Sequence, residues 1–240
     1  MPIFNCVYWW PVYKREPWVN TLAYYPLEVD VNDYSWNWRN WTNSNVTFSD
    51  WVAVFNWTNS EVTFSNASWQ RPITNFTISV WARALSWDHS TYNRNYYIVS
   101  KKYEGMQYYI QSFYEISLSY NNKTFVWGIN NWGSRDVTPW DTNVAISLND
   151  WHLYTITNDD QTKSVYLDGS LLLQGTTWTI SDYSSEPPLR IWNSTPNPSW
   201  SYATNGWFNW NISNVILESK TRTAQEISDY YNSTKSNYGL

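Results

Sequence analysis

The sequence predicts an all-β protein, a two-sheet antiparallel jelly-roll sandwich with one short C-terminal helix. The 240 residues are rich in Val, Ile, Thr, Tyr, Trp and Phe, which favour strands. Roughly a dozen strand-like runs are separated by turns made of Asn, Ser and Asp. Strands do not alternate with helical segments, so the sequence argues against a parallel sheet built from βαβ units.

Composition limits the classes of function. Only 15% of the residues are charged, the net charge is −5, and Lys and Arg are scattered along the chain. We therefore expect no nucleic-acid partner, because phosphate binding needs clustered basic side chains. No apolar run reaches the ~20 residues that span a bilayer, so we expect no membrane insertion. Cys6 is the only cysteine, which rules out an internal disulfide.

The chain divides into a leader or attachment segment, residues 1–19, and a sandwich domain, residues 20–240. Pro11 and Pro17 favour an extended leader. The strands expected in the first half are Leu22–Leu27, Val46–Phe48, Val52–Phe55, Glu61–Phe64, Asn75–Arg83, Tyr96–Lys101 and Gln107–Gln111. Those in the second half are Glu115–Tyr120, Phe125–Gly128, Trp151–Thr157, Ser164–Leu167, Ser170–Leu173, Pro188–Ile191 and Phe208–Leu217. The stretches 32–45 and 129–149 are expected to be turns and loops.

Three local patterns are specific enough to predict geometry. Strict alternation puts Phe76, Ile78, Val80 and Ala82 on one face of a strand, and Thr77, Ser79 and Trp81 on the other. Trp81 implies that this second face is also partly covered. Asp168-Gly169 supplies the positive φ of a tight hairpin. Thr223 and Glu226 form a capping box, which starts a short helix on the sandwich edge.

The order of these segments resembles the laminin G-like, concanavalin A-like jelly-roll domains over about residues 20–240. The resembling pieces are Leu22–Leu27 with Asn32–Ser35, Phe76–Trp81, Trp151–Leu153, Val165–Gly169, Pro188–Ile191, Phe208-Asn209 with Ile212–Val215, and the closing Thr223–Asn232. The resemblance implies a structural Ca²⁺ held by Asp33 and by a neutral oxygen at Asn214. The alternative is that Asp33 caps its own turn.

Tryptophan stands at several sites where this resemblance leads us to expect glycine. The chain has 20 tryptophans and 7 glycines, and seven of the tryptophans stand at such sites: Trp36, Trp38, Trp41, Trp51, Trp57, Trp192 and Trp210. We hypothesise that the gene uses UGA for glycine and that these positions are miswritten. The alternative is a set of real surface tryptophans, which in 33–42 would make a platform for sugar stacking. If they are tryptophans, we expect 36, 38 and 41 on the surface.

The expected function is that of a non-catalytic recognition or adhesion module. An enzyme is not expected, because no Glu-x-Asp-x-x-Glu pattern brings two carboxyls together on one strand. His152 is expected to have a structural or hydrogen-bonded role. Candidate sugar-stacking rings are Tyr97, Tyr108, Tyr109, Tyr114 and Trp207, although for each one taken singly packing is the simpler interpretation.

The expected partner is a glycan or a surface protein, and the expected place is extracellular, on a cell or virion surface. The alternative is a structural or self-assembling protein, such as a phage tail or decoration component, that binds no sugar.

Overall fold

The computed structural model describes residues 19–35, 37–56, 59–64, 70, 74–86, 96–102, 112–118, 124–128, 140–160, 162–176, 188–191 and 209–240. Apart from Val19, the expected leader lies outside this part of the chain, and its separation from the domain stays a prediction. Within the described residues no helix is both long and apolar enough to cross a membrane.

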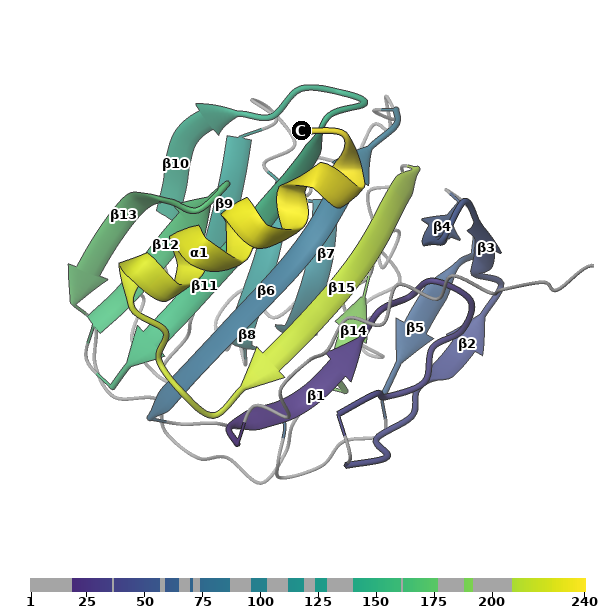
Figure 1. The fold of residues 1–240 in the computed structure, drawn as a ribbon, viewed down its shortest axis with the longest axis horizontal. Helices are drawn as coiled ribbons and strands as arrows, with labels where there is room; N and C mark the ends of the chain where they lie inside the picture. Colours follow the sequence, from purple (N-terminus) through teal and green to yellow (C-terminus); the bar gives the residue numbers. More distant parts are fainter. Residues whose placement is uncertain are drawn as a thin grey trace, which may run out of the picture.

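Two antiparallel sheets stack face to face, as Figure 1 shows. Sheet A has the order β13 (Ser170–Thr176), β12 (Thr162–Leu167), β11 (Trp151–Asp159), β6 (Asn75–Ala84), β15 (Trp210–Glu218), β4 (Val52–Phe55) and β3 (Thr47–Ser49), and β1 (Thr21–Tyr25) also pairs with β15. Sheet B has the order β10 (Trp140–Ala145), β9 (Thr124–Gly128), β8 (Ser112–Leu118), β7 (Tyr96–Lys102), β14 (Arg190–Ile191), β5 (Glu61–Thr63) and β2 (Thr42–Ser44). The predicted sandwich is confirmed.

Strand β6 shows why the two faces of sheet A differ. Its residues Phe76, Ile78, Val80 and Ala82 join the core between the sheets. Trp81 points the other way, into a second apolar cluster on the outer face of sheet A. The alternation predicted from the sequence is confirmed, and so is the cover over the second face.

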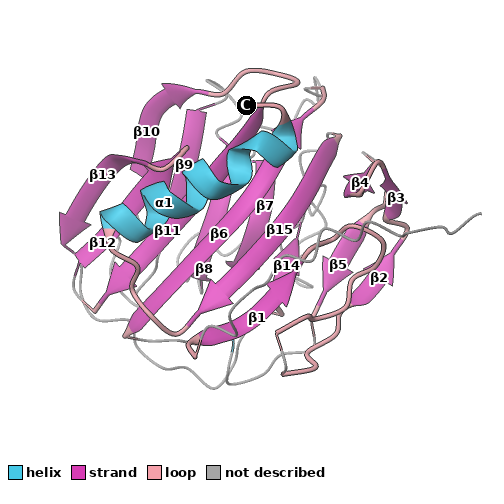
Figure 2. Ribbon diagram, in the orientation of Figure 1, coloured by secondary structure: helices cyan, strands magenta, loops and turns pink. Residues whose placement is uncertain are grey.

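Helix α1 (Ala224–Thr234) provides that cover. Thr223 caps it, and the capping box with Glu226 is present as predicted. The helix lies diagonally across the outer face of sheet A (Figures 1 and 2), and a short 3₁₀ helix, η2 (Lys235–Tyr238), continues it. The predicted place, the sandwich edge, is therefore wrong. The apolar outer cluster attracts the helix onto the face, where Ile227 and Tyr230 are buried.

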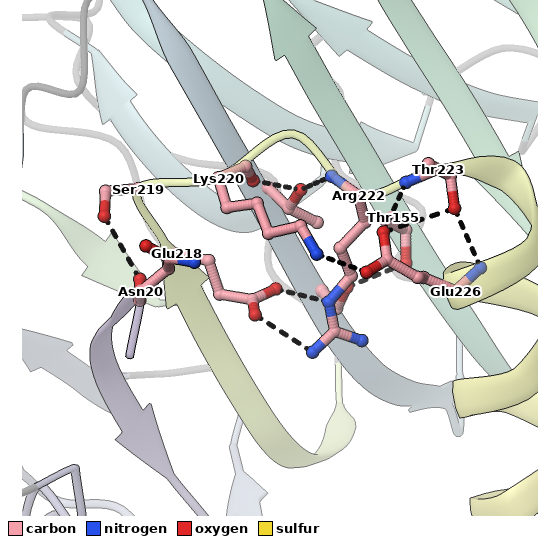
Figure 3. Close-up of polar contacts among 10 residues, drawn as sticks. Asn20, Thr155, Glu218, Ser219, Lys220, Arg222, Thr223 and Glu226 are labelled. Carbon is pink, nitrogen blue, oxygen red and sulfur yellow. Dashed lines mark hydrogen bonds and ion pairs between the residues drawn. The ribbon is translucent and has the colours of Figure 1, made fainter. Parts of the chain in front are cut away.

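Polar contacts fix the connection between β15 and α1 (Figure 3). Glu218 and Arg222 form an ion pair with an Oε2–Nε distance of 2.5 Å, and both side chains are buried. Thr77 of β6 donates from Oγ1 to the Lys220 carbonyl over 2.7 Å and accepts from the Arg222 backbone N–H over 2.9 Å. The ammonium of Lys220 pairs with Glu226. The helix start is thus tied to the central strand of sheet A.

Two segments expected to be loops contain strands. Strand β10 lies within 129–149 and pairs with β9, and strand β2 lies within 32–45 and pairs with β5. Both are edge strands of sheet B. Edge strands need not alternate apolar and polar residues, so the sequence pattern does not reveal them.

The exposure expected for the tryptophans of the 33–42 segment is confirmed at one position and wrong at another. Trp38 is 77% exposed, whereas Trp41 is only 7% exposed. Trp41 turns inward because its backbone N–H bonds to the Val31 carbonyl, which places the ring beside Tyr25 and Phe64. Trp36 lies outside the described residues.

Candidate functional site

Helix α1 covers the middle of the outer face of sheet A. Under α1 lie six buried side chains from the sheet and the helix: Tyr24, Trp81, Trp151, Leu153, Ile216 and Tyr230. Trp81 stacks on Tyr238 with a centroid distance of 4.1 Å, and Arg83 lies over the Trp151 ring. An apolar face packed in this way offers few polar groups to a ligand.

The outer face of sheet B is polar. In β8, Tyr114, Ile116 and Leu118 enter the core between the sheets, and Glu115 and Ser117 alternate with them on the outer side. The strand register aligns Glu115 with Ser100, Ser100 with Arg190, Arg190 with Thr63, and Thr63 with Thr42. We call these five residues, Thr42, Thr63, Arg190, Ser100 and Glu115, the polar row. It crosses five strands of sheet B.

Exposure falls along the polar row. Thr42 at its β2 end is exposed, Thr63 and Arg190 are half-buried, and Ser100 and Glu115 are buried. A ligand approaching this face would therefore meet the β2 end first, and the side chains beyond Arg190 are held below the surface.

Hydrogen-bonding capacity is left over in the middle of the row. The Arg190 guanidinium pairs with Glu61 through Nη1, 2.5 Å from Oε2. Ser117 donates to Glu115 over 3.4 Å. In contrast, the Thr63 Oγ1, Arg190 Nε and Ser100 Oγ atoms are inaccessible to solvent and have no hydrogen-bond partner among the residues that the structure describes. Because buried polar atoms are nearly always paired in folded proteins, three such atoms in register stand out.

The candidate stacking rings fall in different places. Tyr97 lies on the same outer face as the polar row, opposite Ser117, but it is only 6% exposed. Tyr114 is 1% exposed and packs against Phe76 with a centroid distance of 5.8 Å, so it belongs to the core. Neither ring presents a face for sugar stacking. Tyr108, Tyr109 and Trp207 lie outside the described residues.

The sequence did not predict the polar row. Arg190, Glu61 and Glu115 are visible in it only as single charges within strand-like runs. A single charged residue in a strand of an all-β protein only weakly indicates that the outer face of the sheet binds a ligand. Register then decides which charges meet, and the pairing of β14 with β5 and β7 joins segments far apart in the chain.

The predicted calcium residues are already bonded within the protein. The Asp33 carboxylate accepts from the backbone N–H groups of Tyr24, Ser35 and Arg39 and from the Ser35 hydroxyl, over 2.8–3.0 Å. Asn214 accepts through Oδ1 from the Tyr24 hydroxyl over 2.7 Å. With two donors on each Asp33 oxygen, the carboxylate has no lone pair left for a metal ion.

Other candidate metal ligands are scattered in the described part of the chain. No group of three or more His, Cys, Asp or Glu side chains gathers within the described part of the chain. The donor set around Asp33 therefore fits a self-capped turn, the alternative stated from the sequence, better than it fits Ca²⁺. His152 makes the expected structural contact, with Nδ1 2.7 Å from Asp168 Oδ2.

Solved structures with this fold include binding domains and enzymes. The binding domain of Paraclostridial Mosquitocidal Protein 1 matches 89% of this chain and 52% of its own, with 18% identity and a TM-score of 0.68. Trypanosoma rangeli sialidase in complex with sialic acid matches 89% of this chain but only 33% of its own, with 16% identity and a TM-score of 0.63. This chain thus spans about a third to a half of these proteins, and at such identities the likeness concerns the fold alone.

Sequence comparison gives a second line of support. No curated protein sequence matches the chain significantly. A family model described as the concanavalin A-like lectin/glucanases superfamily matches residues 56–228. This match covers more than half of the chain and runs from the end of β4 into α1. The chain therefore belongs to the concanavalin A-like lectin/glucanases superfamily.

Proposed function

We propose that this protein is a non-catalytic carbohydrate-binding module that holds a glycan on the outer face of sheet B, along the polar row. The observation that carries the proposal is the alignment of Thr63 Oγ1, Arg190 Nε and Ser100 Oγ, three atoms without a partner on one line across the sheet. Sugar hydroxyls both donate and accept hydrogen bonds, so they suit a row that mixes hydroxyl and guanidinium groups.

We expect the glycan to contact the polar row at its more exposed end, near Arg190. Arg190 is held by Glu61, so its guanidinium is fixed in place while Nε keeps its donor capacity. A pre-ordered donor loses little side-chain entropy when a ligand binds. Thr42 adds a hydroxyl on the exposed side, and the buried Thr63 Oγ1 lies next to it in register. The contacts expected with a glycan are therefore hydrogen bonds at the β2–β5–β14 edge, without help from the buried Tyr97 ring.

The fold relatives support a carbohydrate ligand. One of them is the binding domain of a mosquitocidal protein, and another is a sialidase in complex with sialic acid. Within this superfamily, a polar sheet face is a reasonable place to seek the ligand. We further propose that the module acts in recognition or adhesion at a cell or virion surface.

Catalysis is not part of the proposal, because the two acidic side chains on this face, Glu61 and Glu115, already bind other residues of the protein. Glycoside hydrolysis needs a carboxyl pair in which one member donates a proton. Glu61 is engaged by Arg190, and Glu115 accepts from Ser117. Both acids thus already have partners within the protein. Incubation with the bound oligosaccharide, followed by an assay for new reducing ends, tests this part, and product formation would overturn it.

The binding proposal is tested with an array of sialylated and neutral oligosaccharides, followed by calorimetry on the best probe. We expect Thr63→Ala and Arg190→Lys each to weaken binding by about tenfold, or about 1.4 kcal/mol. Arg190→Lys keeps a charge for Glu61 but has no Nε donor. Thr47→Ala, at an exposed position of β3 in sheet A, is the matched control and should bind as the wild type does.

Two outcomes would contradict the proposal in different ways. Binding that both variants leave unchanged would move the site away from the polar row. No binding to any oligosaccharide, together with self-association in sedimentation experiments, would favour the structural alternative.

A further inference from the structure

Two hairpins of this protein have the same turn but different residues. In sheet A, Asp168-Gly169 joins β12 to β13, with φ values of 52° and 78°. In the same sheet, Asp50-Trp51 joins β3 to β4, with φ values of 51° and 64°. Two-residue hairpin loops with positive φ at both positions are type I′ turns, for which Asp-Gly is a strongly preferred sequence. Trp51 thus stands where the first hairpin has glycine.

A tryptophan in the left-handed region is unusual for steric reasons. Ten non-glycine residues in the described chain have positive φ, and seven of them are Asn or Asp, whose short side chains tolerate it. The others are Leu27, Trp38 and Trp51. Leu27 is fully buried, so core packing compensates its strain. Trp38 and Trp51 are 77% and 67% exposed, so they have little packing to compensate theirs.

Trp41 shows a different misfit. Its ring makes T-shaped contacts with Phe64 and Tyr25 at centroid distances of 3.9 Å and 4.3 Å. In a T-shaped pair an edge meets a face, so the centroids normally lie farther apart, within about 4.5–7 Å. The indole Nε1 is also buried and has no hydrogen-bond partner. A smaller residue at this position would remove both the crowding and the unpaired donor.

Other tryptophans fit their surroundings well. Trp81 is fully buried, stacks on Tyr238 and donates from Nε1 to Thr234 Oγ1 over 3.3 Å. Trp151 packs against Tyr238 and lies under the Arg83 guanidinium, whose Cζ is 5.1 Å from the ring centroid. These five tryptophans therefore form two sets, one with strained or crowded positions and one with specific contacts.

We propose that the natural protein has glycine at positions 38, 41 and 51 and tryptophan at positions 81 and 151. The gene then carries UGA codons, read as glycine by the source organism, at the first set and UGG codons at the second. UGA is a codon whose meaning differs between genetic codes, so one misread codon explains a chain with 20 tryptophans and 7 glycines. The inference is independent of the glycan proposal, since none of these residues belongs to the polar row.

The nucleotide sequence is the direct test. We expect UGA at codons 38, 41 and 51 and UGG at codons 81 and 151. UGG at 38 or 51 would overturn the proposal, and UGA at 81 or 151 would contradict the sorting by contacts. In protein from the source cells, peptide masses should show glycine at the first three positions.

Thermal unfolding of protein made from a synthetic gene is a second test. Starting from the chain with tryptophan throughout, Trp38→Gly and Trp51→Gly should each raise Tm, by about 2–4 °C. Trp81→Gly is the matched control and should lower Tm sharply, because it leaves a cavity under α1. A fall in Tm for Trp51→Gly as large as that for Trp81→Gly would refute the inference. If the tryptophan chain does not fold, the codons decide.

Discussion

The indole Nε1 of Trp81, at the centre of sheet A, donates a hydrogen bond to Oγ1 of Thr234, the last residue of α1. This bond joins the middle of the sheet to the end of the helix, at a buried position. It adds a polar contact to the apolar cluster that holds the helix across the face of the sheet.

We predict that Trp81→Ala lowers the free energy of unfolding by about 3–5 kcal/mol, the usual range for removing a large core aromatic. Thr234→Val, which keeps the shape and removes the acceptor, should cost about 1–3 kcal/mol. Urea unfolding followed by circular dichroism measures both. Trp38→Ala is the exposed control, and a cost similar to that of Trp81→Ala would contradict the assignment of Trp81 to the helix contact.

For the Glu218–Arg222 pair in Figure 3, removal of Arg222 alone should destabilise the protein more than removal of both charges. Arg222→Met leaves a carboxylate in a buried place and should cost about 3–5 kcal/mol. The double variant Glu218→Gln/Arg222→Met should recover part of that loss, because no charge remains. Chemical unfolding of Glu218→Gln, Arg222→Met and the double variant measures the coupling, and simple additivity would contradict a buried pair.

The same pair predicts a pH effect. Burial raises the pKa of Glu218, and the charge of Arg222 opposes that rise. Without Arg222 the pKa should rise further above its unfolded value. The folded state then binds the proton more tightly, so the deficit of Arg222→Met should shrink as pH falls through the raised pKa. A deficit that grows on acidification would contradict this explanation.

Lys163 predicts a second pH effect, in which burial lowers a pKa and does not raise it. Its side chain is fully buried, its ammonium donates to the Asp160 carbonyl, and burial lowers its pKa to about 8. The unfolded chain, with a pKa near the ordinary 10.5, binds the proton more tightly. Stability should therefore rise between about pH 8 and pH 10.5. Lys163→Met should lose this rise, measured as the difference in Tm between the two proteins across that range.

Gly169 and Gly239 form a matched pair for a steric prediction. Both have left-handed φ values, 78° and 79°. A Cβ at Gly169 would lie 3.0 Å from Tyr231 Cβ and 3.2 Å from Ser228 Cα in α1, whereas at Gly239 it would meet nothing within 4 Å. Both substitutions to Ala should cost about 1–2 kcal/mol for the backbone. Gly169→Ala should cost about 1–3 kcal/mol more for overpacking, measured by urea unfolding.

Asp33 gives a test of the calcium prediction. Because its carboxylate satisfies three backbone N–H groups and a hydroxyl, Asp33→Ala should destabilise the protein by about 2–4 kcal/mol without any metal. Addition of Ca²⁺ or of a chelator should leave Tm of the wild type unchanged. A rise of several degrees with Ca²⁺, lost in Asp33→Ala, would restore the calcium prediction that the family resemblance suggested.

Local patterns in the sequence were sufficient for several elements. The capping box at Thr223 and the hairpin at Asp168-Gly169 depend on neighbouring residues only, and both are confirmed. The alternation of core and outer residues in β6 depends only on the sequence of that strand and on a core on one side of it. These features need no knowledge of distant pairing.

Long-range features could not be read in the same way. The polar row needs the register of five strands, and a shift of one residue would send Arg190 into the core. The burial of Trp41 depends on a hydrogen bond back to Val31 that no turn pattern announces. The sequence predicts the helix at the edge, since it indicates one covered ring, Trp81, and does not reveal the cluster around that ring.

The position of α1 also makes the two sides of the sandwich different. Both the first strand, β1, and the last residue, Leu240, lie on the sheet A side, and the polar row lies on the opposite side. A group joined after Leu240 would therefore lie on the side of the sandwich opposite the polar row. A fluorescent protein or a bead attached after Leu240 should leave the polar row facing outward, which makes the C-terminus the natural handle for immobilising this protein in binding experiments.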